Sequence, residues 1–212
     1  MNALPDGGLD AWPHLFQPGE PGAPILLTLH GTGGNEQEIT ALAAHLDPRA
    51  GVLSPRGRVS EGGANRWFRR LGEGVFDVDD VILRAGELAS FIAAARTEYG
   101  IEDAPLIALG FSNGANIALA TALLHPDALT RVVAFSGMFP FGDREPEAPA
   151  TGVELLLLNG EQDPMAPAAS VARLEQFASA RGASVTRRSR PGGHGIDQAE
   201  LTVAQEWLAR VA

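Results

Sequence analysis

The stretch Leu106-Ile-Ala-Leu-Gly-Phe-Ser112-Asn-Gly114 decides the fold class of this chain. Its first part is a near-continuous apolar run, which is typical of a strand buried on both faces of a parallel sheet. The residues after it are rich in Ala and Leu and predict a helix over Asn113–Leu124. A G-x-S-x-G motif at such a strand–turn–helix junction presents a nucleophilic serine. We predict that Ser112 projects from the turn, and that Gly110 and Gly114 allow strand and helix to approach closely.

Apolar runs of the same kind recur along the chain, with amphipathic segments between them. Central strands are predicted at Ile25–His30, Arg131–Ser136 and Glu154–Asn159, and strands nearer the sheet edges at Gly51–Ser54, Ser184–Ser189 and Ala11–Phe16. Helices are predicted at Glu36–Leu46, Asp77–Tyr99, Ala168–Arg181 and Asp197–Val211. This alternation predicts an α/β fold with a mostly parallel central sheet flanked by helices. We expect a single domain over residues 1–212, because 212 residues with 45% hydrophobic content suffice for one core.

The composition excludes several kinds of partner. Because 16 Lys and Arg face 26 Asp and Glu, the formal net charge is −10, which repels nucleic-acid backbones. There is no cysteine, so chemistry must come from Ser, His and carboxylates. No stretch approaches the ~20 apolar residues of a membrane span, and Met1–Asp10 lacks the charge and apolar run of a signal peptide. We expect a cytoplasmic protein without membrane insertion.

His194 is the best candidate for a general base among five histidines. It lies in Arg190-Pro-Gly-Gly-His-Gly195, between the last predicted strand and the last helix, where an α/β-hydrolase carries its base. The other histidines are interpreted as structural or exposed, with His30 orienting its own loop and the rest being His14, His45 and His125.

The acid of such a triad should follow a strand between nucleophile and base. Asn159-Gly-Glu-Gln-Asp-Pro-Met-Ala-Pro167 follows a Leu-rich strand and offers Asp163, with Glu161 as its rival. We favour Asp163, because a shorter side chain on a turn stiffened by two prolines positions an imidazole better. Asp163 would hold His194 in the correct tautomer.

A second turn that follows a strand is expected to complete an oxyanion hole. In Leu29-His-Gly-Thr-Gly-Gly34, the backbone N–H of Thr32 would act together with that of Asn113, helped by the positive end of the following helix. The alternative is a phosphate-binding loop, which is disfavoured because neither G-K-[ST] nor G-x-G-x-x-G follows the strand.

Together these motifs resemble the small carboxylesterase and phospholipase family that includes acyl-protein thioesterases. The resemblance rests on the four motifs above and on Ser54–Phe68, which is similar to the segment preceding a Trp-Phe pair in the bacterial esterase branch. It implies an α/β-hydrolase fold without a separate lid domain, acting on short or medium acyl esters, with the Trp67–Phe68 pair and Met165 near the pocket. Acyl-protein thioesterases usually have Gln after the nucleophile, whereas this chain has Asn113.

Two further groups of residues have alternative interpretations. Met138-Phe139-Pro-Phe141 after a strand is either an acyl-binding wall or ordinary packing over the sheet edge. A basic and an acidic group lie close in sequence, and would either grip an anionic substrate or form a solvated ion-pair network. They are Arg66, Arg69 and Arg70, and Asp77, Asp79 and Asp80.

The residues thus predict a serine carboxylesterase for short- to medium-chain esters that works through an acyl-enzyme and needs no cofactor and no metal. A thioesterase or lysophospholipase with the same triad is the nearest alternative. A non-catalytic ligand-binding protein on a hydrolase scaffold is the alternative of another class. The expected partner is a small-molecule ester, and a homodimer is a candidate assembly.

Overall fold

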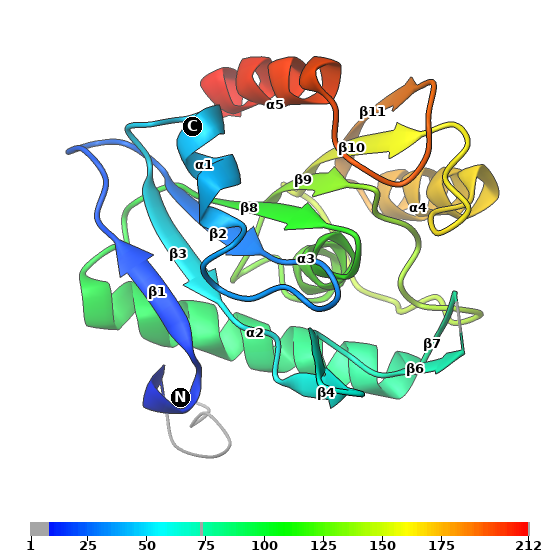
Figure 1. Cartoon of the computed structure of the whole chain (residues 1–212), viewed down its shortest axis with the longest axis horizontal. Coiled ribbons are helices and arrows are strands. Elements are labelled where there is room, and N and C mark those ends of the chain that lie inside the picture. The colour runs from blue at the N-terminus through cyan, green and yellow to red at the C-terminus, as the bar shows by residue number, and fades with distance from the viewer. Residues whose placement is uncertain (1–8, 73, 212) are drawn as a thin grey trace.

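The computed structural model describes residues 9–72 and 74–211, so most of Met1–Asp10 lies outside the described residues. Its centre is a seven-stranded sheet in the order β1-β3-β2-β8-β9-β10-β11 (Figure 1). The strands are β1 His14–Gln17, β2 Ile25–Leu29, β3 Gly51–Pro55, β8 Leu106–Phe111, β9 Arg131–Phe135, β10 Glu154–Gly160 and β11 Ser184–Arg190. All neighbouring pairs are parallel except β1 with β3. This confirms the predicted fold class.

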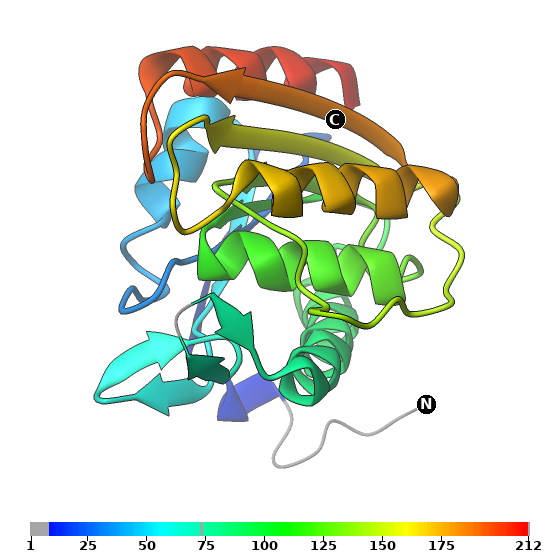
Figure 2. The same ribbon diagram turned by 90° about the vertical axis from the view of Figure 1, so that its right-hand side faces the viewer.

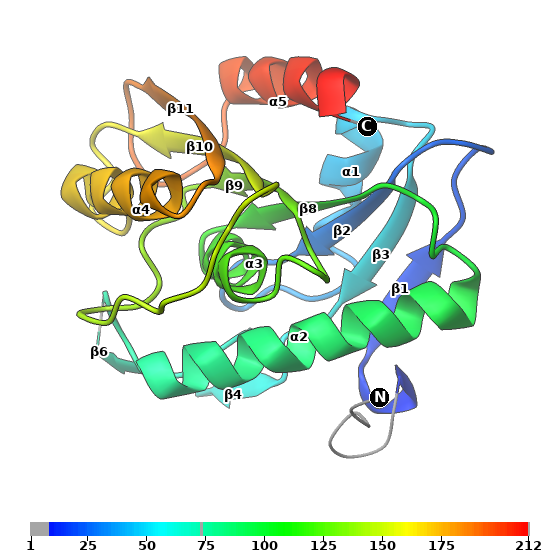
Figure 3. The same ribbon diagram turned by 180° about the vertical axis from the view of Figure 1, so that it is seen from behind.

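Helices cover both faces of the sheet. One face carries α1 (Thr40–Leu46) and α5 (Gln198–Val211), and the other carries α2 (Val78–Tyr99), α3 (Asn113–Leu124) and α4 (Ala168–Ala180) (Figures 1 and 3). Figure 2 shows α3 and α4 side by side, with α5 on the opposite side of the sheet. No helix in the described part of the chain is long and apolar enough to cross a bilayer.

The central strands are apolar throughout because each of their faces packs against helices. In β10, Leu155 and Leu157 join the hydrophobic cluster under α2, α3 and α4, whereas Leu156 and Leu158 join the cluster under α1 and α5. Each of these four leucines is at most 1% exposed. The edge strand β11 is instead mostly half-buried or exposed, in keeping with its polar sequence.

The structure differs from the sequence prediction in three segments. The first strand begins at His14 rather than Ala11, because Leu9–Ala11 forms a 3₁₀ turn. The first helix begins at Thr40 rather than Glu36, because Asn35 Oδ1 accepts from the N–H groups of Gln37 and Glu38 in a turn. Glu36 instead accepts two hydrogen bonds from Arg56, each 2.6 Å long.

A further difference lies between β3 and α2, where no helix or strand is predicted from the sequence. This segment contains two short antiparallel ribbons, β4 (Val59–Glu61) with β5 (Ala64–Arg66), and β6 (Arg70–Gly72) with β7 (Val75–Phe76). Their strands have only two or three residues each, too few for a periodic pattern to appear in the sequence.

Candidate active site

Ser112 lies between the carboxyl end of β8 and the start of α3. Its backbone has φ 53° and ψ −114°, a left-handed conformation that is costly for a residue with a side chain. Two backbone hydrogen bonds hold it there, since its N–H donates to the Phe135 carbonyl and its own carbonyl accepts from the Asn116 N–H, at 2.9 and 3.0 Å. The strained turn exposes the hydroxyl to a cavity at this end of the sheet.

The two glycines of the motif are sterically required. A Cβ on Gly110 would lie 2.6 Å from the backbone of Ala115, and a Cβ on Gly114 would overlap the carbonyl oxygen of Leu29. Real Cβ contacts do not come closer than 3.0 Å, so any side chain would push α3 away from β8 or β2. Both glycines therefore allow strand and helix to approach closely, as the sequence predicts.

His194 and Asp163 are in direct contact. The Nδ1 atom of His194 lies 2.8 Å from Oδ2 of Asp163, whose carboxylate is fully buried. Oδ1 of Asp163 accepts from the backbone N–H groups of Met165 and Ala166. Burial alone would raise the pKa of Asp163, but the hydrogen bonds from His194 and these N–H groups outweigh it and hold the pKa below its ordinary value. The rival Glu161 is exposed.

Close backbone packing brings the loop of Asp163 against the loop of His194. The Gln162 N–H donates to the Gly192 carbonyl at 2.9 Å, and a Cβ on Gly160 would overlap the carbonyl oxygens of Gly192 and Gly193. The two loops follow neighbouring parallel strands, so their meeting is a consequence of the sheet order.

Arg190 holds the His194 loop through hydrogen bonds to its backbone carbonyls. Its Nη2 donates to the carbonyls of Gly193 and Gly195, at 3.3 and 2.8 Å, and its Nε pairs with Glu200 at 2.7 Å. Glu200 in turn accepts from the N–H of Asp197, while Asp197 caps the Glu200 N–H, which completes a capping box at the start of α5.

The His194 ring packs against Phe111, the last residue of β8 and the residue that precedes Ser112. Its centroid is 5.0 Å from that of Phe111. Ser112 Oγ makes no hydrogen bond to any of the described residues, so it is free to meet a reactant. The Ser136 hydroxyl, also at the cavity, lies 3.5 Å from the Gly195 carbonyl of the His194 loop.

Thr32 and Asn113, the expected oxyanion-hole residues, both line the cavity that holds Ser112. Within the described chain, neither backbone N–H has a hydrogen-bond acceptor. The Asn113 side chain is fixed because its Oδ1 accepts from the Trp67 N–H at 2.8 Å. Asn65 holds the Thr32 turn by donating to the Gly34 carbonyl and accepting from the Gly33 N–H.

His30 supports this turn from inside the protein. Its Nε2 accepts from the Gly57 N–H at 3.0 Å, and its carbonyl accepts from the indole N–H of Trp67 at 2.8 Å. Burial lowers the pKa of His30, so its ring is neutral at physiological pH with the proton on Nδ1. The interpretation of His30 as a residue that orients its own loop agrees with these contacts.

The cavity around Ser112 has a volume of about 320 Å³ and a mixed lining. Of the residues predicted to bind substrate, Met165 lines it and is 46% exposed. Trp67, Phe68, Met138 and Phe139 are instead at most 7% exposed and lie outside its lining, because they pack inside the protein. Phe76, Asn116 and Ser136 line the cavity without having been singled out from the sequence.

Residues 12–212 match the family model described as phospholipase/carboxylesterase. The chain belongs to the phospholipase/carboxylesterase family. It is similar to MhqD of Bacillus subtilis (strain 168), classed by name as a hydrolase, with 36% identity over 92% of this chain and 96% of that protein. It is 28% identical to the esterase YpfH of Escherichia coli (strain K12), over 90% of this chain and 84% of that one.

Among solved structures, that of the Bacillus cereus carboxylesterase superposes with a TM-score of 0.89 at 37% identity, covering 95% of each chain. The predicted resemblance is confirmed, and with it the α/β-hydrolase fold. Family membership supports an enzyme that hydrolyses esters.

Proposed function

We propose that the chain is a serine carboxylesterase that hydrolyses short- to medium-chain esters through an acyl-enzyme. The observation that carries the proposal is the buried Asp163 carboxylate, 2.8 Å from Nδ1 of a His194 ring that packs against Phe111, the neighbour in sequence of the strained and unpaired Ser112. Because Asp163 accepts at Nδ1, the proton of neutral His194 lies on that atom and Nε2 is left as a base.

In the proposed reaction, His194 takes the proton of Ser112 as Oγ attacks the ester carbonyl carbon. The negative charge that develops on the carbonyl oxygen is stabilised by the N–H groups of Thr32 and Asn113. The alcohol leaves with the proton from His194, and the acyl group stays on Oγ. Water then loses a proton to His194 and attacks the acyl-enzyme, and His194 returns that proton to Oγ as the bond to the acyl group breaks and the acid is released.

A short acyl group matches the cavity volume of about 320 Å³. Its lining includes apolar surface from Phe76, Pro164 and Met165, which would contact an alkyl chain. These features favour short and medium acyl groups over the long chain of a lysophospholipid.

A fluorophosphonate probe tests the nucleophile directly. We expect labelling of wild-type protein and its loss in Ser112→Ala, with a fall in ester hydrolysis of at least about 1,000-fold. Absence of labelling in the wild type would refute the proposal in favour of a ligand-binding protein. Esterase activity that survives Ser112→Ala would refute the assigned nucleophile.

A substrate panel separates the enzymatic alternatives. We expect faster turnover of a short p-nitrophenyl ester than of an acyl thioester or a lysophospholipid of matched concentration. Preference for the thioester or the lysophospholipid would replace the carboxylesterase assignment while keeping the same catalytic residues.

A further inference from the structure

The cavity that holds Ser112 has a cationic wall. Two arginines, Arg66 and Arg70, line it together with Thr32 and Asn116. A neutral ester has no formal charge that these guanidinium groups could match. In a chain of net charge −10, two arginines in the lining of one cavity are not expected from the overall composition and indicate a specific role.

Arg66 is held rigidly and has donors left over. Its side chain is only 4% exposed, with Nη1 donating to the Thr32 hydroxyl at 2.9 Å and Nε directed at the Phe68 carbonyl at 3.3 Å. Its Nη2 has no hydrogen-bond partner among the described residues and is not among their fully buried unpaired atoms. Arg66 and Thr32, the hydrogen-bond partner of its Nη1, both line the cavity that holds Ser112, which places the guanidinium at the cavity with N–H donors to spare.

The charges of this wall are not balanced within the described residues. Glu61 is the one carboxylate that pairs with either arginine there, at 3.2 Å from Arg66 and 2.9 Å from Arg70. Glu61 is 42% exposed, so solvent screens its charge. Two cations sharing one screened anion leave an excess positive charge at the cavity.

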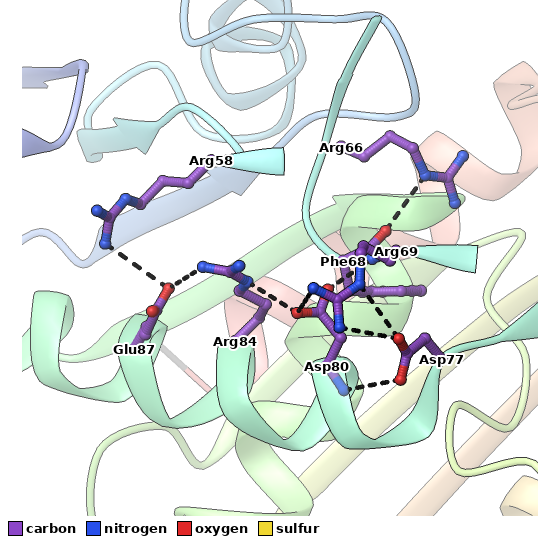
Figure 4. Close-up of polar contacts among 8 residues, drawn as sticks. All are labelled: Arg58, Arg66, Phe68, Arg69, Asp77, Asp80, Arg84 and Glu87. Carbon is purple, nitrogen blue, oxygen red and sulfur yellow. Dashed lines mark hydrogen bonds and ion pairs between the residues drawn. The ribbon is translucent and has the colours of Figure 1, made fainter. Parts of the chain in front are cut away.

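The segment that carries the two arginines is anchored to the start of α2. Figure 4 shows Arg69, between them in sequence, paired with Asp77 and Asp80. The fully buried Asp80 also accepts from the Arg69 backbone N–H at 2.7 Å and pairs with Arg84. The ion-pair network considered from the sequence therefore exists, with a buried carboxylate at its centre, but it uses Arg69 and leaves Arg66 and Arg70 at the cavity.

We propose that the cavity binds an anionic group of the substrate, so that the preferred substrates are esters carrying a free carboxylate that Arg66 and Arg70 bind. A planar guanidinium with free N–H donors matches a carboxylate, and a partly buried site strengthens the pairing. Phe76 and Met165 would contact the alkyl chain between the carboxylate and the reacting ester. This inference rests on the proposed esterase function.

The test compares esters that differ in charge at matched length. Monomethyl adipate carries the carboxylate on the acyl side and is compared with dimethyl adipate. ω-Acetoxyhexanoate carries it on the alcohol side and is compared with hexyl acetate. A pH-stat measures kcat/KM for each, and the readout is the ratio of the anionic to the neutral ester. We expect a ratio above one for one of the two pairs, which identifies the part of the ester that enters the cavity.

Three variants locate the effect. We expect Arg70→Gln and Arg66→Lys to lower this ratio by about tenfold, which corresponds to about 1.4 kcal/mol. Arg188→Gln changes the net charge as Arg70→Gln does, on the exposed face of β11, and should leave the ratio unchanged. Ratios that do not respond to Arg66→Lys and Arg70→Gln, or that fall equally in Arg188→Gln, would overturn the proposal.

Binding without turnover separates this proposal from the proposed function. The Ser112→Ala variant is titrated with adipate and with the neutral dimethyl adipate in a calorimeter. We expect tighter binding of adipate, weakened about tenfold when Arg70→Gln is added. Equal affinity for the charged and the neutral compound would overturn the anion site even if the protein is an esterase. Adipate binding that depends on Arg70 in a protein without esterase activity would retain the site and refute the enzyme.

Discussion

Gly160→Ala tests how closely the loops of Asp163 and His194 must pack. The added Cβ would lie about 1 Å closer to the Gly192 and Gly193 carbonyl oxygens than the 3.4 Å at which ordinary van der Waals contact begins. Both obstacles are backbone atoms, so one loop has to move by about that distance. The 2.8 Å contact between Asp163 and His194 would then lengthen beyond hydrogen-bonding range.

We expect kcat/KM for a short p-nitrophenyl ester to fall about 100-fold, because a displacement of about 1 Å is enough to misplace a base. The free energy of unfolding in urea should fall by about 1–3 kcal/mol from overpacking. Gly193→Ala is the matched control, since its Cβ would lie 3.8 Å from its nearest neighbour, the Gln162 carbonyl oxygen. A folded Gly160→Ala protein with activity within about threefold of wild type would refute the argument that this close approach sets the geometry.

Three further predictions concern the charges that support the site. The lowered pKa of Asp163 means that its ionised form stabilises the protein above its ordinary pKa of 3.8 and that this contribution is lost as the pH falls through the lowered value. Urea unfolding over a series of pH values should therefore show a weaker loss of stability below about pH 4 in Asp163→Asn than in wild type, and equal pH slopes would contradict this. Arg190→Met should cost about 3 kcal/mol in the same assay, because it leaves Glu200, whose side chain is 5% exposed, without its cation; a loss under about 1 kcal/mol would contradict it. Asp80→Ala should cost a similar amount, about 3 kcal/mol, since it leaves the Arg69 N–H without an acceptor and removes one of the two carboxylates that pair with Arg84, and unchanged thermal unfolding would argue against the anchoring role of Asp80.

The central strands of the sheet could be predicted because each is marked by a continuous apolar run within its own sequence. The runs at β2, β8, β9 and β10 are apolar at every position that packs against a helix on either face, and such a run has few other stable placements. Asp77 caps α2 and Gly100 ends it in a left-handed conformation, so the bounds of this helix were also readable. The ribbons between β3 and α2 were not, because their pairing depends on neighbours rather than on period.

The candidate site divides in the same way. The spacing of Gly110, Ser112 and Gly114 is a local pattern that predicts a strand–turn–helix junction. The sequence by itself therefore determined the position of the strained serine. The choice between Asp163 and Glu161 rested on side-chain length, whereas in the structure only the former is buried against His194.

Only the tertiary structure decided which side chains face the cavity. The sequence predicts Trp67 as a substrate contact, yet its indole N–H donates to the His30 carbonyl inside the protein. Its neighbour Arg66 lines the cavity instead. No local pattern distinguishes the two, because segments far apart in the chain meet there. The parallel direction of the strands brings their carboxyl ends to one edge of the sheet, and their order, a property of the whole fold, decides which loops meet there.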